Sequence, residues 1–279
     1  MKLKALEIEN LDYTYPDGTP ALRGISLEVP LKARMVVLGA NGSGKSTLLL
    51  HLNGLLVTQR GSVRVFGRPV GKRNLAEVRR RGGMVFQNPD DQLFSTSVTE
   101  DVAFGPRNLG LDPGEVARRV ARALELTGIQ ELAHRPPHHL SLGQKKRAAI
   151  AGVLAMEPEL LVLDEPTASL DPAAVRRLMA ILELLHARGR TIIMATHDVD
   201  LAYAWADRVA VLSEGRLLAV AGATELLRDE ELMHRASLEP PVLLRVFRNT
   251  GFFPRHPDEA AEWVQRIIAE NKRRNGTGF

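Results

Sequence analysis

Short, almost entirely apolar runs recur along the chain, and each of them stops abruptly at polar or glycine residues. The clearest examples are Met35–Leu38, Leu160–Leu163 and Thr191–Ala195. Runs of this length and β-branched content are typical of strands that are buried on both faces, as they are in a parallel sheet. The pattern therefore predicts an α/β protein with a mostly parallel core sheet.

Alternating apolar and polar positions precede the first of these runs. Ala5–Glu9 and Gly24–Val29 alternate with period two, and the turn-rich segment Tyr15–Pro20 separates them. This arrangement predicts a hairpin, and hence a small antiparallel β subdomain. A second hairpin is expected near the end of the sheet, where Val209–Leu212 and Leu217–Val220 flank a short turn.

A helical pattern replaces the strand pattern from Val98 to Leu140, and Glu115–Leu126 is clearly amphipathic. We expect a helical subdomain, at about residues 95–158, inserted into a larger domain of residues 1–240. After this domain we expect a C-terminal extension, residues 241–279, with one helix at Asp258–Lys272. That helix starts acidic and ends basic, as the helix dipole favours. We expect the extension to pack on the core or on a partner.

Composition and charge narrow the class of protein only slightly. The chain has 279 residues, of which 44% are hydrophobic and 25% charged, as in ordinary soluble proteins. It has no cysteine, which excludes disulfide and thiolate chemistry. No signal-peptide core and no apolar run of the ~20 residues needed to span a membrane is present, so we expect any membrane role to be peripheral and cytoplasmic. The net charge of +4 permits nucleic acid or anionic lipid as a partner but favours neither.

The segment Gly39–Thr47 matches the phosphate-loop pattern G-x-x-x-x-G-K-[ST] at every fixed position. A glycine-rich turn that binds nothing is the alternative, but a buried strand precedes the segment and an apolar helix pattern follows it. We expect Lys45 to reach the β- and γ-phosphates of a nucleotide and the Ser46 hydroxyl to ligate Mg²⁺. The candidate nucleotide-binding residues are Gly39, Asn41, Gly42, Ser43, Gly44, Lys45, Ser46 and Thr47.

Two adjacent carboxylates, Asp164 and Glu165, follow the apolar run at Leu160–Leu163. They could be ordinary surface charge, but together with a phosphate loop they match the acidic half of a nucleotidase site. We expect Asp164 to hold Mg²⁺ and Glu165 to polarise the attacking water. His197 follows another apolar run, at the strand end where ligands bind in such sheets. It could contact the γ-phosphate and hold Glu165 in place.

Three further features have a structural and a functional interpretation. Tyr15 could pack on its sheet or stack against a purine. Gln87 could be the solvated end of a strand, or it could ligate Mg²⁺ and sense a partner. Ser141 and Gln144 have the spacing of a capping box, so a helix is expected to begin at Ser141. The same helix N-terminus could also bind a phosphate group.

The complete set of motifs, in this order, resembles the nucleotide-binding subunits of ATP-binding cassette transporters over roughly residues 3–235. Phe86–Phe94 and Asp101–Pro106 further resemble the energy-coupling factor ATPases, and Arg135–Ser141 resembles the cobalt and nickel importers. The motifs that carry the wider resemblance are Tyr15, Gly39–Thr47, Gln87, Leu140–Gln144, Leu160–Glu165, Ser169–Asp171 and His197.

The resemblance implies a P-loop NTPase (RecA-like) fold and an ATPase with Mg²⁺ as cofactor. Two ATPase subunits would pack head to tail, with Ser141, Gly143 and Gln144 of one reaching the ATP bound by the other. Ser169 and Asp171 would lie in the loop at that interface. The family signature usually has glycine where this chain has Leu142, which puts the local backbone and the hydrolysis rate in question.

The implied partners are a second ATPase subunit, an integral membrane coupling subunit and a substrate-binding membrane subunit, with the ATPase on the cytoplasmic face of the membrane. The cargo would be cobalt or nickel. Three alternatives stay open: a vitamin importer with two different ATPase chains, a non-transport cassette ATPase acting on nucleic acid or the ribosome, and a regulatory subunit with little catalysis. The mild charge and single cassette disfavour nucleic acid, and a P-loop kinase is disfavoured because no acceptor pocket is suggested.

Overall fold

The computed structural model describes residues 4–275 of the chain. Its first sheet is antiparallel and follows the order β2-β1-β4-β5. The central strand β1 pairs with β2 on one side and with β4 on the other. The predicted N-terminal hairpin is therefore confirmed. The four strands are β1 (Lys4–Thr14), β2 (Pro20–Pro30), β4 (Arg60–Val65) and β5 (Arg68–Pro69).

The second sheet has six strands: β3 (Arg34–Leu38), β6 (Gly82–Val85), β7 (Leu160–Asp164), β8 (Thr191–Thr196), β9 (Arg208–Ser213) and β10 (Arg216–Gly222). They lie in the order β10-β9-β3-β8-β7-β6. All neighbouring strands are parallel except β9 and β10, which form an antiparallel hairpin. Both the mostly parallel core sheet and the second hairpin are thus confirmed.

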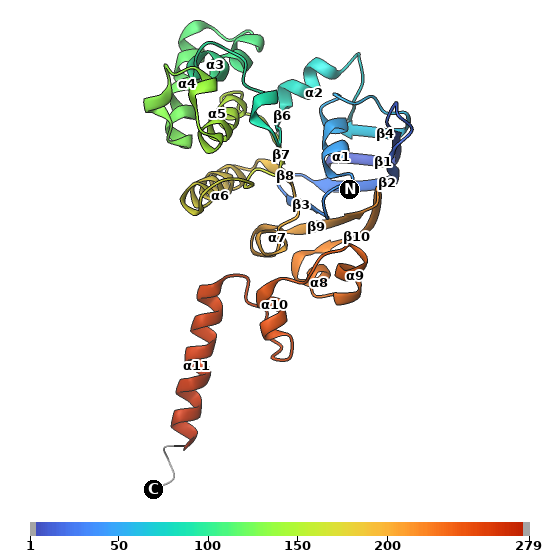
Figure 1. Cartoon of the computed structure of the whole chain (residues 1–279), viewed down its shortest axis with the longest axis vertical. Coiled ribbons are helices and arrows are strands. Elements are labelled where there is room, and N and C mark those ends of the chain that lie inside the picture. Colours follow the sequence, from blue (N-terminus) through green and yellow to red (C-terminus); the bar gives the residue numbers. More distant parts are fainter. Residues whose placement is uncertain (1–3, 276–279) are drawn as a thin grey trace.

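Helices fill the stretch between β6 and β7. Figure 1 shows α3, α4 and α5 gathered in one lobe beside β6. The helical pattern predicted for Val98–Leu140 is confirmed, and the amphipathic part corresponds to α4. The elements in this stretch are η1 (Pro89–Asp91), α3 (Val98–Asn108), α4 (Pro113–Thr127), η2 (Gln130–Leu132), η3 (Pro137–His139) and α5 (Leu142–Leu154).

Both faces of the six-stranded sheet are buried. On β3, Met35 and Val37 pack into a core shared with the antiparallel sheet and with helix α1 (Lys45–Leu52), whereas Val36 and Leu38 pack into a core shared with the other helices. This explains why the strand sequence is continuously apolar, because a strand between two cores has no solvent face. The remaining helices of the domain are α2 (Leu75–Arg81), α6 (Pro172–Ala187), α7 (Val199–Trp205), α8 (Ala223–Leu227) and α9 (Glu230–Arg235).

The C-terminal extension contains two helices, α10 (Val242–Phe247) and α11 (Pro257–Asn275), where the sequence led us to expect one. The Tyr203 hydroxyl donates a hydrogen bond to the Phe253 carbonyl, and the Arg255 guanidinium donates to the Tyr203 carbonyl. The start of the extension therefore packs on the core, while α11 points away from it (Figure 1). Among residues 4–275, no helix combines the length and the apolar character needed to cross a membrane.

Candidate functional site

The loop between β3 and α1 contains several positions that favour glycine. Gly44 has φ of 102° and is the N-cap of α1, a conformation that strains residues with a side chain. A Cβ atom at Gly39 would lie 2.3 Å from the carbonyl oxygen of Leu212. The strand–loop–helix context that the phosphate-loop motif requires is therefore present, with amide groups and a helix N-terminus available to an anion.

Lys45, the first residue of α1, is buried beneath this loop. Its Nζ atom donates hydrogen bonds to the carbonyl oxygens of Gly39, at 2.8 Å, and Ala40, at 3.1 Å. The same Nζ atom lies 3.6 Å from a carboxylate oxygen of Glu165. Because a buried charge needs such partners to be tolerated, the ammonium group is held at the centre of the site, between the loop and the acidic strand end.

Asp164 and Glu165 lie at the carboxyl end of β7, and both are buried. One carboxylate oxygen of Asp164, Oδ1, has no hydrogen-bond partner among the described residues. Burial raises the pKa of Asp164, while a hydrogen bond from the Ser46 hydroxyl acts in the opposite direction. An unpartnered carboxylate oxygen beside a hydroxyl suits a hard cation such as Mg²⁺, which prefers oxygen ligands. The residues present therefore fit a magnesium ion.

Glu165 is held from two sides. Thr196 donates a hydrogen bond to Oε2 at 3.2 Å, and Nδ1 of His197 lies 3.0 Å from Oε1. The His197 side chain is 54% exposed, whereas that of Glu165 is 6% exposed, so the imidazole links a buried carboxylate to the surface. The structure thus brings together Lys45, Glu165 and His197, the three residues that the sequence suggested for catalysis.

Of the two further nucleotide-site candidates, Tyr15 contacts the phosphate loop, whereas Gln87 makes no hydrogen bond to the site among the described residues. The Tyr15 hydroxyl lies 2.9 Å from Oγ1 of Thr47, and its ring meets that of Tyr13 edge to face. Tyr15 is therefore connected to the phosphate loop. Gln87 follows β6, which neighbours β7 in the sheet. Gln87 is exposed and its side chain makes no hydrogen bond within residues 4–275, so no hydrogen bond joins it to Ser46 or Asp164.

Helix α5 begins as the sequence predicted. Ser141 is its N-cap, its hydroxyl accepts from the Gln144 amide, and the Gln144 side chain accepts from the Ser141 amide at 2.9 Å. This capping box forms although Leu142 replaces the usual glycine. Leu142 is 46% exposed and occupies the first helical position, so the substitution leaves the start of the helix undisturbed.

The N-terminus of α5 faces the loop that follows the acidic pair. Together they line a cavity whose walls include Ser141, Gly143, Gln144 and Asp171. The Asp171 side chain caps α6 by accepting from the Ala174 amide, and Ser169 has φ of 63°. No hydrogen bond or ion pair within the described part of the chain joins this cavity to the phosphate loop. The phosphate loop and this cavity are thus two candidate half-sites on one chain.

Lys146 is a residue of this region that the sequence analysis did not identify. Its side chain is buried, and its Nζ atom donates hydrogen bonds to the carbonyl oxygens of Glu165, at 2.8 Å, and Ala168, at 2.7 Å. Burial lowers the pKa of this ammonium group. The available signal was a lysine on the same helical face as Ile150 and Val153, which are buried too.

Comparison with known proteins agrees with this geometry. Residues 22–168 match the family model described as ABC transporter. The chain is 52% identical over 245 residues to the energy-coupling factor transporter ATP-binding protein EcfA of Carboxydothermus hydrogenoformans, covering 88% of this chain and 90% of the relative. It is 51% identical over 252 residues to EcfA of Methanothermobacter thermautotrophicus, covering 88% and 81% respectively.

Solved structures show the same similarity. The structure of cbiO1 from Clostridium perfringens, described as part of the ABC transporter complex cbiONQ, superposes with a TM-score of 0.72 at 42% identity, covering 89% of this chain and 99% of that one. A dimeric ATP-binding cassette in a post-hydrolysis state, bound to ADP and Pi, superposes with a TM-score of 0.72 at 26% identity. It covers 78% of this chain and 98% of the other.

Proposed function

Because the chain belongs to the ABC transporter family, as an ATP-binding subunit of the energy-coupling factor type, we propose that it powers the import of cobalt or nickel ions. Hydrolysis of ATP coupled to transport is the activity of this family. The observation that supports this activity most directly is the convergence of Lys45, Glu165 and His197 at one edge of the sheet.

In this proposal the phosphate loop holds the nucleotide. The Gly39–Thr47 amides and Lys45 would bind the β- and γ-phosphates, and the Lys45 ammonium would exchange its loop carbonyls for phosphate oxygens. Tyr15, hydrogen-bonded to Thr47, would present its ring to the purine. Ser46, Gln87 and Asp164 would hold Mg²⁺, which when bound offsets the negative charge of the phosphates.

Glu165 would act on the attacking water as general base. Its carboxylate is oriented by Thr196 and His197, and a base fixed in this way needs no rearrangement before it accepts a proton. The exposed edge of His197 would contact the γ-phosphate, and Lys45 would stabilise the charge that develops there.

The second half-site suggests that two copies are needed. We propose a homodimer in which Ser141, Gly143 and Gln144 of one copy complete the ATP site of the other, with Ser169 and Asp171 at the interface. Two observations support it: these residues lie on a surface separate from the phosphate loop, and similar cassettes form dimers. The γ-phosphate would then hold two helix N-termini together, and hydrolysis would release them.

The proposed partners are an integral membrane coupling subunit and a substrate-binding membrane subunit, reached from the cytoplasmic face of the membrane. The loop Gln87–Phe94 is suited to transmit the motion. Gln92 donates a hydrogen bond to the Ala149 carbonyl in α5 at 2.9 Å, and Asp90 pairs with Lys145. The loop is therefore tied to the same helix as the second half-site. Cobalt is favoured by the Arg135–Ser141 motif and by the similarity to cbiO1.

The test is sedimentation of the Glu165→Gln variant with and without Mg-ATP. A shift from monomer to dimer that requires ATP supports the homodimer. Demonstrated ATP binding without a shift would point to a second, different ATPase chain. A vitamin importer would then be the favoured assignment instead of a metal importer. Uptake of radioactive cobalt by cells that express the chain with its membrane subunits tests the cargo, and uptake unaffected by Glu165→Gln would refute the proposal.

A further inference from the structure

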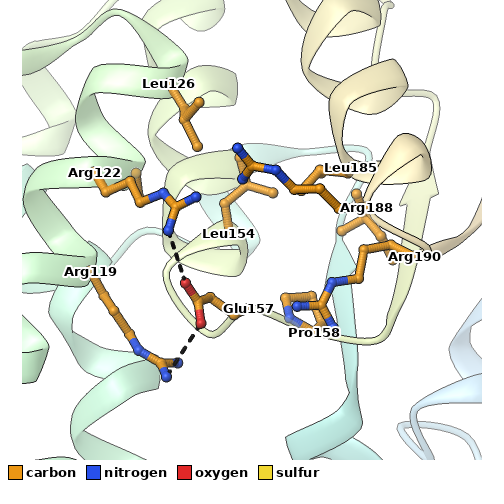
Figure 2. A pocket seen from close by; sticks show the side chains of 11 residues that line it. Arg119, Arg122, Leu126, Leu154, Glu157, Pro158, Leu185, Arg188 and Arg190 are labelled. Atoms are coloured by element: carbon orange, nitrogen blue, oxygen red, sulfur yellow. Dashed lines mark ion pairs between the residues drawn. The ribbon is translucent and has the colours of Figure 1, made fainter.

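A cavity of about 220 Å³ lies beside the amino ends of β7 and β8, whereas Asp164, Glu165 and His197 lie at the carboxyl ends of these strands. It is bounded by α4, by the turn between α5 and β7, and by the segment that joins α6 to β8. Figure 2 shows Arg119 and Arg122 reaching in from one side, and Arg188 and Arg190 from the other. The floor is apolar and is formed by Ala123, Leu126, Leu154, Pro158, Leu161 and Leu185.

Positive charge exceeds negative charge in this cavity. Among the described residues, Glu157 is the only carboxylate that lines it, and it lies 3.4 Å from Arg119 and 3.6 Å from Arg122. The side chains of Arg188 and Arg190 make no hydrogen bond or ion pair within the described residues. These two guanidinium groups, on a segment that turns back toward the sheet, therefore have their donors available to a ligand.

The lining matches one class of ligand. Guanidinium groups present planar pairs of donors that fit phosphate oxygens, and several of them favour a dianion over a single negative charge. The apolar floor would cover a small aliphatic or aromatic group. We propose that this cavity binds a small organic phosphate, with its phosphate on Arg122, Arg188 and Arg190 and its apolar part over Leu126 and Leu154.

Glu157 would compete with a bound phosphate for the guanidinium groups of Arg119 and Arg122. Figure 2 shows its carboxylate between Arg119 and Arg122, with an ion pair to each. Both ion pairs are long and the Glu157 side chain is 40% exposed, so solvent weakens them. A phosphate dianion can displace this carboxylate, and removal of the Glu157 charge should strengthen binding.

Because of the position of the cavity, a bound ligand would connect two parts of the molecule. Arg119 and Arg122 belong to the helical lobe, whereas Arg188 and Arg190 belong to the segment that leads into the sheet. A bound anion would tie the two together at the end of α5 opposite to Ser141. If the proposed function holds, and α5 moves during the ATP cycle, the ligand should change the rate of ATP turnover.

Isothermal titration with phenyl phosphate of protein saturated with Mg-ADP, which in the proposed function fills the phosphate loop, tests the site independently of ATP hydrolysis. The measurement compares the wild type with the double variant R188Q/R190Q and with the control R64Q/R216Q, which removes two exposed arginines outside the cavity. We expect saturable binding in the wild type and the control, and at least about tenfold weaker binding in R188Q/R190Q. Glu157→Gln should bind about threefold more tightly than the wild type.

Several outcomes would overturn the proposal. Absence of wild-type binding, or equal binding by the wild type and R188Q/R190Q, would refute the site. Inorganic phosphate that binds as tightly as phenyl phosphate would refute the role of the apolar floor. Tighter binding of a glutamate-rich peptide than of phenyl phosphate would refute the small organic phosphate as the ligand and would indicate an acidic protein segment instead. Binding without any change in ATP turnover would refute the consequence for α5 while leaving the site itself intact.

Discussion

The side-chain ammonium of Lys146 donates a hydrogen bond to the main-chain carbonyl of Glu165 at 2.8 Å. Lys146 lies in the helix that begins beside Ser141, and Glu165 is the proposed general base. A second bond from the same ammonium reaches the Ala168 carbonyl at 2.7 Å. The half-site proposed to serve the partner's ATP is therefore joined, through a buried cation, to the segment of its own chain that carries Glu165.

Lys146→Met is expected to lower the maximal rate of ATP hydrolysis about tenfold with little change in KM. Methionine keeps most of the side-chain volume but leaves the buried carbonyl of Glu165 and the half-buried carbonyl of Ala168 without this donor, which loosens the backbone at Glu165. Steady-state phosphate release over a range of ATP concentrations measures both constants. Lys146→Gln, which restores a donor, should recover part of the rate. A rate equal to that of the wild type in a folded Lys146→Met variant would contradict the positioning role.

Glu165→Gln is expected to reduce ATP turnover by about a hundredfold or more while ATP binding is retained. The amide keeps the shape of the side chain and can still interact with Thr196 and His197, but it cannot accept a proton from water. Phosphate release and equilibrium binding of a fluorescent ATP analogue separate the two effects. Turnover at the wild-type level would show that another group acts as the base.

Two substitutions at Tyr15 distinguish its hydroxyl from its ring. Tyr15→Phe removes the hydrogen bond to Thr47 and should weaken ATP binding only slightly, because the aromatic face is kept. Tyr15→Ala removes the face as well and should weaken binding about tenfold. Titration with ATP in the absence of hydrolysis compares the two variants. Equal losses in both would mean that the hydroxyl, and not stacking, supports the nucleotide.

His51 should make the stability of the protein depend on pH. Its side chain is fully buried, Nδ1 donates to the Thr47 carbonyl at 2.8 Å, and burial lowers the pKa of the imidazole below its ordinary value of 6.5. The folded state therefore binds a proton less readily than the unfolded state. The stability that His51 contributes is complete above pH 6.5 and declines as the pH falls toward the lowered pKa.

Thermal unfolding at about pH 7.5 and about pH 5 tests this dependence. His51→Gln removes the titrating group. On acidification, the melting temperature of this variant should fall by fewer degrees than that of the wild type. The exposed His134 provides a matched control, since His134→Gln should keep the wild-type dependence. The interpretation of His51 fails if all three proteins lose the same number of degrees.

The sequence analysis also missed α6, although its 16 residues are enough to show a helical period. The other helices that it left unidentified have little periodic signal. Helices α7, α8 and α9 are too short to display several turns of a 3.6-residue period. In α2, only Val78 is buried, so its arginines and glutamate dominate the pattern. The short helix α10 in the C-terminal extension escaped notice because its six residues, apolar except for Arg245, could equally form a strand.

The sequence by itself determined the phosphate loop, the acidic strand end, the capping box at Ser141 and most strands of the two sheets. These features depend on short-range chemistry: glycines that permit one backbone path, alternation that fixes a buried face, and a side chain that caps the next turn. Only the tertiary structure decided which distant segments meet. The bond from Lys146 to Glu165, and the arginine cavity between α4 and β8, arise because periodicity shows that a helix face is buried but not what it is buried against.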